Sequence, residues 1–302
     1  MNLISKPART LLFFAFFTIL GIFSCKKENS DASSGDQYNA SLAAAESNAE
    51  AEFVFNDVFD NVMGVNNDVG MQGTGVFGRL MSNNGQNERP LACFTVDIKE
   101  LAAPATFPLQ ITIDFGPGCE GKDGHTRKGK IIARYTGRLI TPGKSASVTF
   151  EGFAIDSILV EGTETISNTS VTGNRQFTID VSNARLSKSN GNYIAWNNHK
   201  IITQTDGLNT PDFALDDVFT IEGNSSGQLK SQTLLATWQS EIESPLVKKF
   251  LCRWIVEGKI KTTLGASSAN NQWTAELDFG SGACDGKATI TINGSTQEIS
   301  LH

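Results

Sequence analysis

From Ala92 to the C-terminus, apolar and polar side chains alternate along the chain, and this period of two constrains the fold most strongly. Leu109–Phe115 and Lys130–Thr136 are two such stretches. Because successive side chains of a strand point to opposite faces, each stretch predicts a strand with one buried and one wet face. Further stretches of the same kind span 93–98, 147–153, 158–166, 175–186, 193–203, 219–222, 232–238, 254–262, 273–279 and 288–292.

Turn-forming pairs separate many of these stretches. They are Asp123-Gly124, Pro142-Gly143, Asn190-Gly191, Asp206-Gly207 and Asn293-Gly294. Pairs of this kind favour the tight hairpins of antiparallel sheets. No helical segment lies between the strands to serve as the crossover that a parallel sheet needs. We therefore expect an all-β fold of about a dozen antiparallel strands, arranged as a meander or a sandwich.

One segment before the strands has a helical period instead. Its apolar residues recur at i, i+3, i+4, i+7 and i+8, and they are Phe55, Val58, Phe59, Val62 and Met63. The alanine-rich stretch before them favours a helix, and Gly64 can end it. We expect an N-terminal amphipathic helix over residues 41–63, packed by its phenylalanine face on the β-rich domain of 41–302. Residues 66–89 are rich in Asn and Gly and predict a long loop.

The first 24 residues have the pattern of an export signal. Lys6 and Arg9 precede a largely apolar run, Leu11–Phe23, which is shorter than the roughly 20 residues of a membrane span. Ser24-Cys25 follows and resembles the lipobox of bacterial lipoproteins. This resemblance implies a signal peptide over 1–24, cleavage before Cys25, and acyl chains such as palmitate on that cysteine. The polar residues of 25–40 predict a flexible tether.

Lys26-Lys27-Glu28 resembles the surface-export signals of Bacteroidetes lipoproteins. With the lipobox, it implies an outer-membrane lipoprotein on the periplasmic or cell-surface side, whose membrane contact is the lipid on Cys25. Without the two basic residues of 1–24, 23 Lys and Arg oppose 32 Asp and Glu, a formal charge of −9. That acidity argues against nucleic acid as a partner, since nucleic-acid recognition relies on basic patches.

Four cysteines remain after Cys25, and an even number in an exported chain favours disulfides. An internal repeat, 91–138 and 250–294, suggests how they pair. Asp-Phe-Gly occurs in both copies, at Asp114 and at Asp278, and each copy holds two cysteines, 26 and 32 residues apart. We predict one bridge in each copy, Cys93–Cys119 and Cys252–Cys284. A metal site built from the four cysteines is the alternative, and the absence of CxxC spacing disfavours it.

Residues 114–130 form the densest polar cluster in the sequence. Asp114, Glu120, Asp123, His125 and Arg127 are the candidate ligand-binding residues there. They would bind a carboxylate or phosphate, with Arg127 making bidentate contacts. The three acids could also bind calcium, but their spacing matches no EF-hand loop. The alternative that we favour is a charged hairpin tip, because the second copy of the repeat lacks the equivalent basic segment.

No established catalytic pattern is present. HExxH and Gly-x-Ser-x-Gly are absent, and the chain has 3 histidines. We therefore predict no metal site and no cofactor, name no catalytic residue, and favour a non-catalytic role. The tryptophans could form a sugar-stacking platform, although aromatic residues in strands are more often core. They are Trp196, Trp238, Trp254 and Trp273.

Three segments, Asp114–Cys119, Gly121–Lys130 and Tyr135–Arg138, resemble a family of uncharacterised Bacteroidetes cell-envelope lipoproteins. That family has a repeated Asp-Phe-Gly-x-Gly-Cys and Gly-Lys-Asp-Gly hairpin motif. The resemblance implies an envelope lipoprotein and brings no activity or catalytic residues with it.

Three functions stay open. The first is a non-catalytic envelope protein that binds or supports an envelope partner, and the second is a carbohydrate-binding or carbohydrate-active surface lipoprotein. The third is a lipid-carrying half-barrel, similar to periplasmic lipoprotein carriers. A solvent-exposed line of tryptophans would favour the second, and a deep apolar groove under the helix would favour the third.

Overall fold

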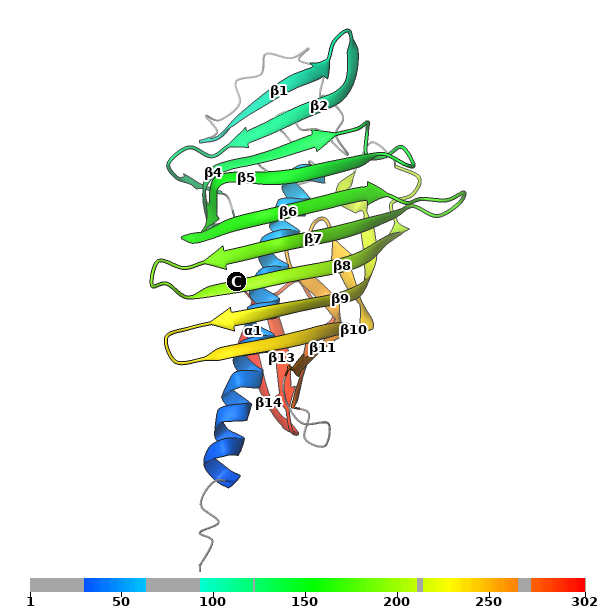
Figure 1. The fold of residues 1–302 in the computed structure, drawn as a ribbon. Helices are drawn as coiled ribbons and strands as arrows, with labels where there is room; N and C mark the ends of the chain where they lie inside the picture. Colours follow the sequence, from blue (N-terminus) through cyan, green and yellow to red (C-terminus); the bar gives the residue numbers. More distant parts are fainter. Residues whose placement is uncertain (1–29, 64–92, 122, 211–213, 266–272, 302) are drawn as a thin grey trace, which may run out of the picture.

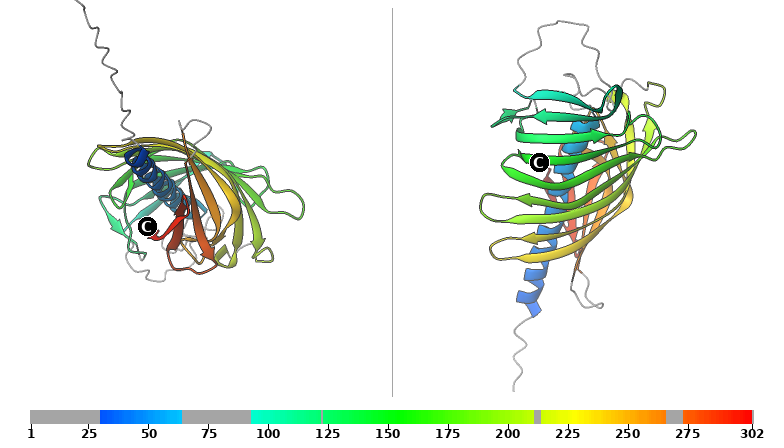
Figure 2. Two further views of the ribbon diagram at one scale, coloured as in Figure 1. Left: turned by 90° about the horizontal axis from the view of Figure 1, so that it is seen from below. Right: turned by 45° about the horizontal axis from the view of Figure 1, so that its top comes forward.

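The computed structural model describes residues 30–63, 93–121, 123–210, 214–265 and 273–301. In it, one α-helix, α1 (Ser30–Met63), lies along the inner side of a single curved sheet of 14 strands, and a short 3-10 helix, η3 (Ala214–Asp216), precedes β9 (Figure 1). Viewed from below, the sheet curls around the helix (Figure 2). The strands are β1 (Thr95–Ala102), β2 (Ala105–Asp114), β3 (Cys119–Glu120), β4 (Thr126–Tyr135), β5 (Ser145–Ile155), β6 (Ile158–Asn168), β7 (Gln176–Ser187), β8 (Tyr193–Asp206), β9 (Val218–Lys230), β10 (Leu235–Lys249), β11 (Ile255–Leu264), β12 (Thr274–Ser281), β13 (Lys287–Ile292) and β14 (Ser295–Ser300).

The strands follow one another through the sheet in sequence order, with β3 paired to β4 outside that path. All pairs are antiparallel, which confirms the expected all-β fold, and the single sheet decides for a meander over a sandwich. Two strands had no signal in the sequence. The strand β3 is 2 residues long, and β14 is exposed along nearly all of its length, so neither alternates.

The hairpin turn between β5 and β6 contains no glycine, unlike the turn pairs recognised in the sequence. Asp156 and Ser157, between β5 and β6, both have positive φ, of 47° and 71°. Asp tolerates this conformation better than most residues. Its carboxylate accepts a hydrogen bond from the backbone N–H of Thr126, at 2.9 Å, and also contacts His125 Nδ1. The turn is therefore stabilised by Thr126, the first residue of the neighbouring strand β4, and by His125, which directly precedes that strand.

Glycine bulges bend the strands around the helix. Gly129 has φ 71° and sits at a register shift between β4 and β5, where a Cβ would lie 2.2 Å from the carbonyl oxygen of Gly152. Gly258 has φ 107° at a register shift between β10 and β11, where a Cβ would lie 2.5 Å from Pro245 O. Bulges of this kind increase the local twist and curvature of a sheet. The concave inner surface follows from them.

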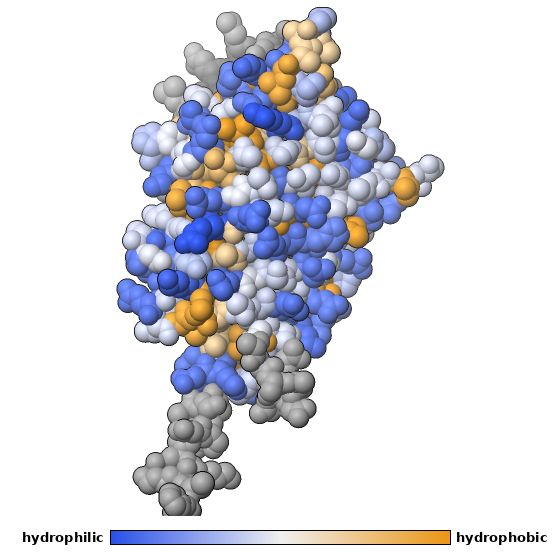
Figure 3. All heavy atoms as spheres, in the orientation of Figure 1, coloured by the Kyte–Doolittle hydropathy of each residue, from blue (hydrophilic) through white to orange (hydrophobic). Residues whose placement is uncertain are grey.

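The predicted apolar face of α1 is buried. Phe55, Val58, Phe59, Val62 and Met63 are at most 3% exposed, and they belong to the same core as the inward side chains of the strands. Figure 3 shows the opposite side of the sheet, where the surface is mostly hydrophilic with small separate apolar spots. The apolar half of the alternating pattern therefore faces the helix.

The helix begins at Ser30, which corrects the expected start at residue 41. Residues 30–40, expected to belong to a flexible tether, continue α1 beyond the sheet (Figure 1). These residues lack the apolar period that predicts a packed helix. A helix that is already nucleated by its packed part gains one hydrogen bond for each residue added, which favours this extension.

Both disulfides pair as predicted, Cys93 with Cys119 and Cys252 with Cys284. Each bridge joins the residues before one strand to the residues after the next strand, around the hairpins β1–β2 and β11–β12. The Asp-Phe-Gly segments also share their local structure. Asp114 accepts a hydrogen bond from Gly116 N–H at 2.9 Å, and Asp278 accepts one from Gly280 N–H at 2.8 Å. The glycine in each segment turns the chain at the strand end, as in an Asx turn.

Candidate functional site: a cavity between the helix and the sheet

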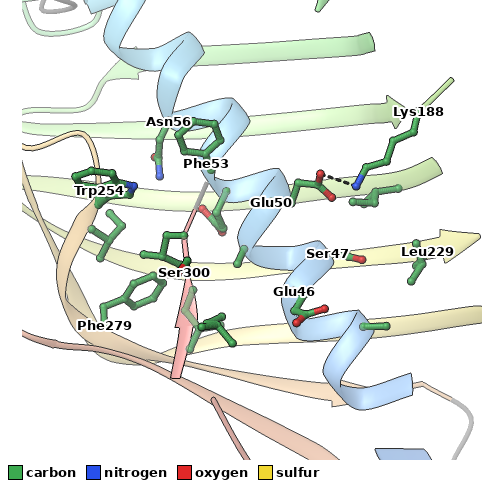
Figure 4. Close-up of a pocket in the computed structure, with 18 of the residues that line it drawn as sticks. Glu46, Ser47, Glu50, Phe53, Asn56, Lys188, Leu229, Trp254, Phe279 and Ser300 are labelled. Carbon is green, nitrogen blue, oxygen red and sulfur yellow. Dashed lines mark ion pairs between the residues drawn. The ribbon is translucent and has the colours of Figure 1, made fainter. Parts of the chain in front are cut away.

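A cavity of about 430 Å³ lies between α1 and the inner surface of the sheet (Figure 4). This volume falls within the range of small-molecule sites, roughly 300–1,000 Å³. Apolar side chains from the helix and several strands line it, among them Phe53, Leu229, Leu246, Ile260, Phe279 and Ile299.

Polar residues lie on two sides of this cavity. On one side Glu50 of α1 pairs with Lys188 after β7, with 2.7 Å between Oε1 and Nζ. On the other side Figure 4 shows Asn56 of α1 and Trp254 before β11. An apolar body with a few polar groups at its ends is typical of a site for an amphipathic molecule.

Arg253 lies beside Trp254 in the cavity wall. Its guanidinium stacks over the Trp254 ring at 4.9 Å and lies 5.7 Å from the centre of the Phe53 ring. Its Nη1 donates to the backbone oxygen of Asp123 at 2.7 Å. Within the described part of the chain, no carboxylate forms an ion pair with it. Arg253 Nε and Trp254 Nε1 are buried donors without a hydrogen-bond partner among the described residues. Such donors are uncommon, because each costs roughly 1–3 kcal/mol when left unpaired.

Buried ion pairs fasten α1 inside the sheet. Lys200 of β8 binds Glu52, and Lys248 of β10 binds Asp60 at 2.9 Å. Burial raises the pKa of Asp60 to about 6, although the charge of Lys248 opposes this rise. Three acidic residues of α1, Glu52, Asp57 and Asp60, thus form ion pairs with basic residues of distant strands.

Glu164 of β6 is a further buried acid near this group. It is 1% exposed, and its Oε2 has no hydrogen-bond partner among the described residues. Burial raises the pKa of Glu164 to about 8, although Lys200 acts in the opposite direction. The carboxyl group is therefore largely protonated at neutral pH, which removes the cost of burying an unpaired charge.

The tryptophans do not form an exposed line. Trp196 and Trp238 are at most 2% exposed, and both indoles donate to Asn48 Oδ1 of α1, at 3.0 and 3.3 Å. Trp254 and Trp273 are half-buried. The large apolar side chains that the described residues expose include no tryptophan. This arrangement gives no support to a sugar-stacking platform.

The five candidate residues of the 114–130 cluster are only partly brought together. Asp123, His125 and Arg127 lie together at the start of β4. Asp114 instead pairs with Lys130, with 3.4 Å between Oδ2 and Nζ, and Glu120 is exposed on β3. Their charges are met within the protein. The His125 ring contacts Asp156, and the Arg127 guanidinium is bound by Asp123 and by a helix acid.

Arg127 in particular is not a free anion-binding group. It is 3% exposed, and its Nη2 lies 2.5 Å from Asp57 Oδ1 of α1 and 2.7 Å from Asp123 Oδ2. Burial would raise the pKa of Asp123, but hydrogen bonding and charge from Arg127 lower it below its usual value. In the described ranges, no group of three or more His, Cys, Asp and Glu side chains is arranged to hold a metal ion.

The cavity residue Arg253 was not named as a site residue from the sequence, and Trp254 was named only as part of a possible sugar-stacking platform. A usable signal was present in the repeat. Cys93 is followed directly by Phe94, whereas Cys252 is followed by Arg253 and then Trp254. The second copy of the repeat therefore has an additional charged residue, Arg253, directly after its cysteine, and this difference between the copies marks the position.

Comparison with protein-family models, with curated proteins and with solved structures gives no match to this chain. Among the described residues, no helix has the length and apolar character needed to cross a membrane.

Proposed function

We propose that this protein binds a molecule with an apolar chain in the cavity between α1 and the sheet, as a lipid-carrier-like half-barrel. The observation that carries the proposal is the apolar lining of a cavity of about 430 Å³ on the concave side of an open sheet. Of the three functions that the sequence left open, only this one requires such a cavity. No catalytic step is part of the proposal.

The expected affinity follows from the burial of methylene groups. Each buried methylene contributes about 0.8 kcal/mol, so an acyl chain that buries about ten of them gains roughly 8 kcal/mol. The loss of translational and conformational freedom on binding reduces this gain. We therefore expect dissociation constants in the micromolar range or weaker, which suits a ligand that is taken up and released again.

Ala49→Phe is expected to weaken binding of an apolar ligand at least tenfold. Ala49 lies on α1 in the cavity wall, and a phenyl ring there would occupy the space of the ligand. The measurement is the fluorescence of N-phenyl-1-naphthylamine, a neutral apolar probe, titrated with the chain from residue 25 carrying Cys25→Ser.

The matched control is Ala40→Phe, on the same helix but outside the cavity wall. It should bind the probe like the parent chain. Melting curves of both variants show whether the fold is kept. Equal binding by the two variants, or no binding by the parent chain, would refute the proposed function.

We further propose that the protein is held at the outer membrane by lipid on Cys25. Two acyl chains bury enough methylenes for stable anchoring. The start of α1 at Ser30 supports a short connection, because it leaves few residues between Cys25 and the helix. At 1.5 Å per residue, the first cavity residue, Ala43, lies about 20 Å along the helix from Ser30. A helical stalk of this length would hold the cavity at a defined distance from the lipid surface.

Cys25→Ala in the full chain is expected to release the protein from the membrane. The measurement is the distribution between membrane and soluble fractions after cell lysis. Ser24→Ala, which keeps both a small residue and the cysteine, should leave the protein in the membrane fraction. A Cys25→Ala chain that still fractionates with membranes contradicts the lipid anchor.

A further inference from the structure

We infer that the ligand carries an anionic head group, bound by Arg253 and Trp254 at one side of the cavity, on an apolar chain that occupies the remainder. This inference rests on the proposed function and names the class of ligand: a single-chain anionic amphiphile such as a fatty acid. The observation behind it is that two neighbouring donors in the cavity wall, Arg253 Nε and Trp254 Nε1, are buried and have no partner among the described residues.

The guanidinium of Arg253 has one nitrogen bonded to the protein and a buried Nε without a partner among the described residues. Nη1 is bound to the backbone oxygen of Asp123, and no described hydrogen bond involves Nε or Nη2. Nε and Nη2 form the side-on edge of a guanidinium, which matches the two oxygens of a carboxylate or phosphate. The bond from Nη1 and the stacking on Trp254 fix the plane of the group, so little freedom is lost when a ligand binds.

The charges around the cavity favour an anion at this side and no other. Glu50 is neutralised by Lys188, and Glu52 by Lys200. Arg253 forms no ion pair with a described carboxylate, although its charge acts on nearby Asp123, so it is the cavity cation that a ligand anion can pair with. The Asn56 amide, on the same side in Figure 4, can contribute a further hydrogen bond. A cationic head would be repelled by Arg253, and an uncharged acceptor would make weaker hydrogen bonds to the two donors than an anion does.

The positions of Arg253 and Trp254 are fixed by the covalent and secondary structure on either side of them. Cys252, directly before Arg253, is bridged to Cys284, which follows β12. Arg253 and Trp254 are thus held between a disulfide and the first residue of β11. A short segment fixed at both ends keeps its donors oriented in the absence of ligand, and such preorganisation favours binding.

The test compares two probes that share one chain and differ in the head: cis-parinaric acid and its methyl ester. The chain from residue 25 with Cys25→Ser should bind the acid at least tenfold more tightly than the ester, because hydrogen bonds to a charged group are the stronger kind. Arg253→Gln should reduce this preference to within about twofold and leave ester binding unchanged. Trp254→Phe keeps an aromatic ring without the donor and should weaken acid binding about two- to tenfold.

Lys188→Gln is the matched control, since it removes the other cavity cation, which Glu50 already neutralises. It should keep the preference for the acid. Loss of the preference in Lys188→Gln and not in Arg253→Gln would overturn the assignment to Arg253. Equal binding of acid and ester by the parent chain would overturn the anionic head and leave the proposed function standing. Binding of neither probe would refute the proposed function itself.

Competition against bound cis-parinaric acid identifies the head group further. Palmitate and hexadecyl phosphate have chains of the same length and differ in the anion. Displacement at lower concentrations of palmitate assigns a carboxylate, and displacement at lower concentrations of hexadecyl phosphate assigns a phosphate. Hexadecanol, which is uncharged, should compete at least tenfold less well than either, and equal competition by the alcohol would contradict the inference.

Discussion

Arg127→Met is expected to lower the free energy of unfolding by about 3–5 kcal/mol, the usual cost of removing one partner of a buried ion pair. The guanidinium binds Asp57 of α1 and Asp123 before β4, and the Asp57 side chain is 9% exposed. Without Arg127, the Asp57 carboxylate keeps only a hydrogen bond from the Asn61 amide in a place with little access to water, whereas the Asp123 side chain, at 27% exposure, is reached by water. Denaturation by urea, followed by circular dichroism, measures the loss.

The pH dependence of the difference in unfolding free energy between the parent chain and Arg127→Met provides a second test. Arg127 lowers the pKa of Asp123 in the folded protein, so this contribution to stability is present above the pKa of about 3.8 in the unfolded chain and is lost as the pH falls through the lowered value. The stability difference between the parent chain and Arg127→Met should therefore narrow below about pH 4. Lys128→Met, an exposed neighbour on β4, should change stability by less than about 0.5 kcal/mol. A loss below about 1 kcal/mol for Arg127→Met would contradict its role in fastening α1.

Removing either disulfide is expected to cost about 3–4 kcal/mol. The bridges close segments of 26 and 32 residues, and the chain-entropy relation for loops of this size gives that range. The double variants Cys93→Ser/Cys119→Ser and Cys252→Ser/Cys284→Ser measure it by urea denaturation. Reduction of the parent chain should reproduce the sum of their effects.

The two bridges should differ in their effect on binding. The second bridge adjoins Arg253, so its loss should also weaken the preference for cis-parinaric acid over its ester. The first bridge, at the β1–β2 hairpin, serves as the control and should leave that preference unchanged. A stability loss below about 1 kcal/mol for both double variants would contradict the stabilising role of the bridges.

Most of the strands, most of the hairpin turns and the disulfides of this fold can be predicted from the sequence, because each depends on residues that are close together in the chain. Alternation and turn pairs predict the strands because strand period and hairpin conformation are properties of neighbouring residues. The repeat predicts the disulfides because each bridge closes within one copy. The turn at Asp156 and Ser157 was missed because its stability comes from Thr126 and His125 on another hairpin.

The candidate site depends on contacts that no local pattern contains. Arg127 was a candidate ligand-binding group, with a charged hairpin tip as the favoured alternative, and neither interpretation anticipates its partner Asp57, which lies 70 residues earlier in the chain. The cavity depends on how strongly the sheet curves, and that curvature comes from register shifts such as the one at Gly258. Neither the pairing of charges across the core nor the space left between helix and sheet follows from the order of residues along one strand.

The most direct measurement of the central claim is native mass spectrometry of the Cys25→Ser chain, purified without detergent from the cells that produce it. Binding in the cavity predicts a one-to-one complex with a lipid-sized molecule, retained by Ala40→Phe and lost by Ala49→Phe. A complex of equal abundance in Ala49→Phe, or no complex in the parent chain before and after incubation with palmitate, would contradict the claim.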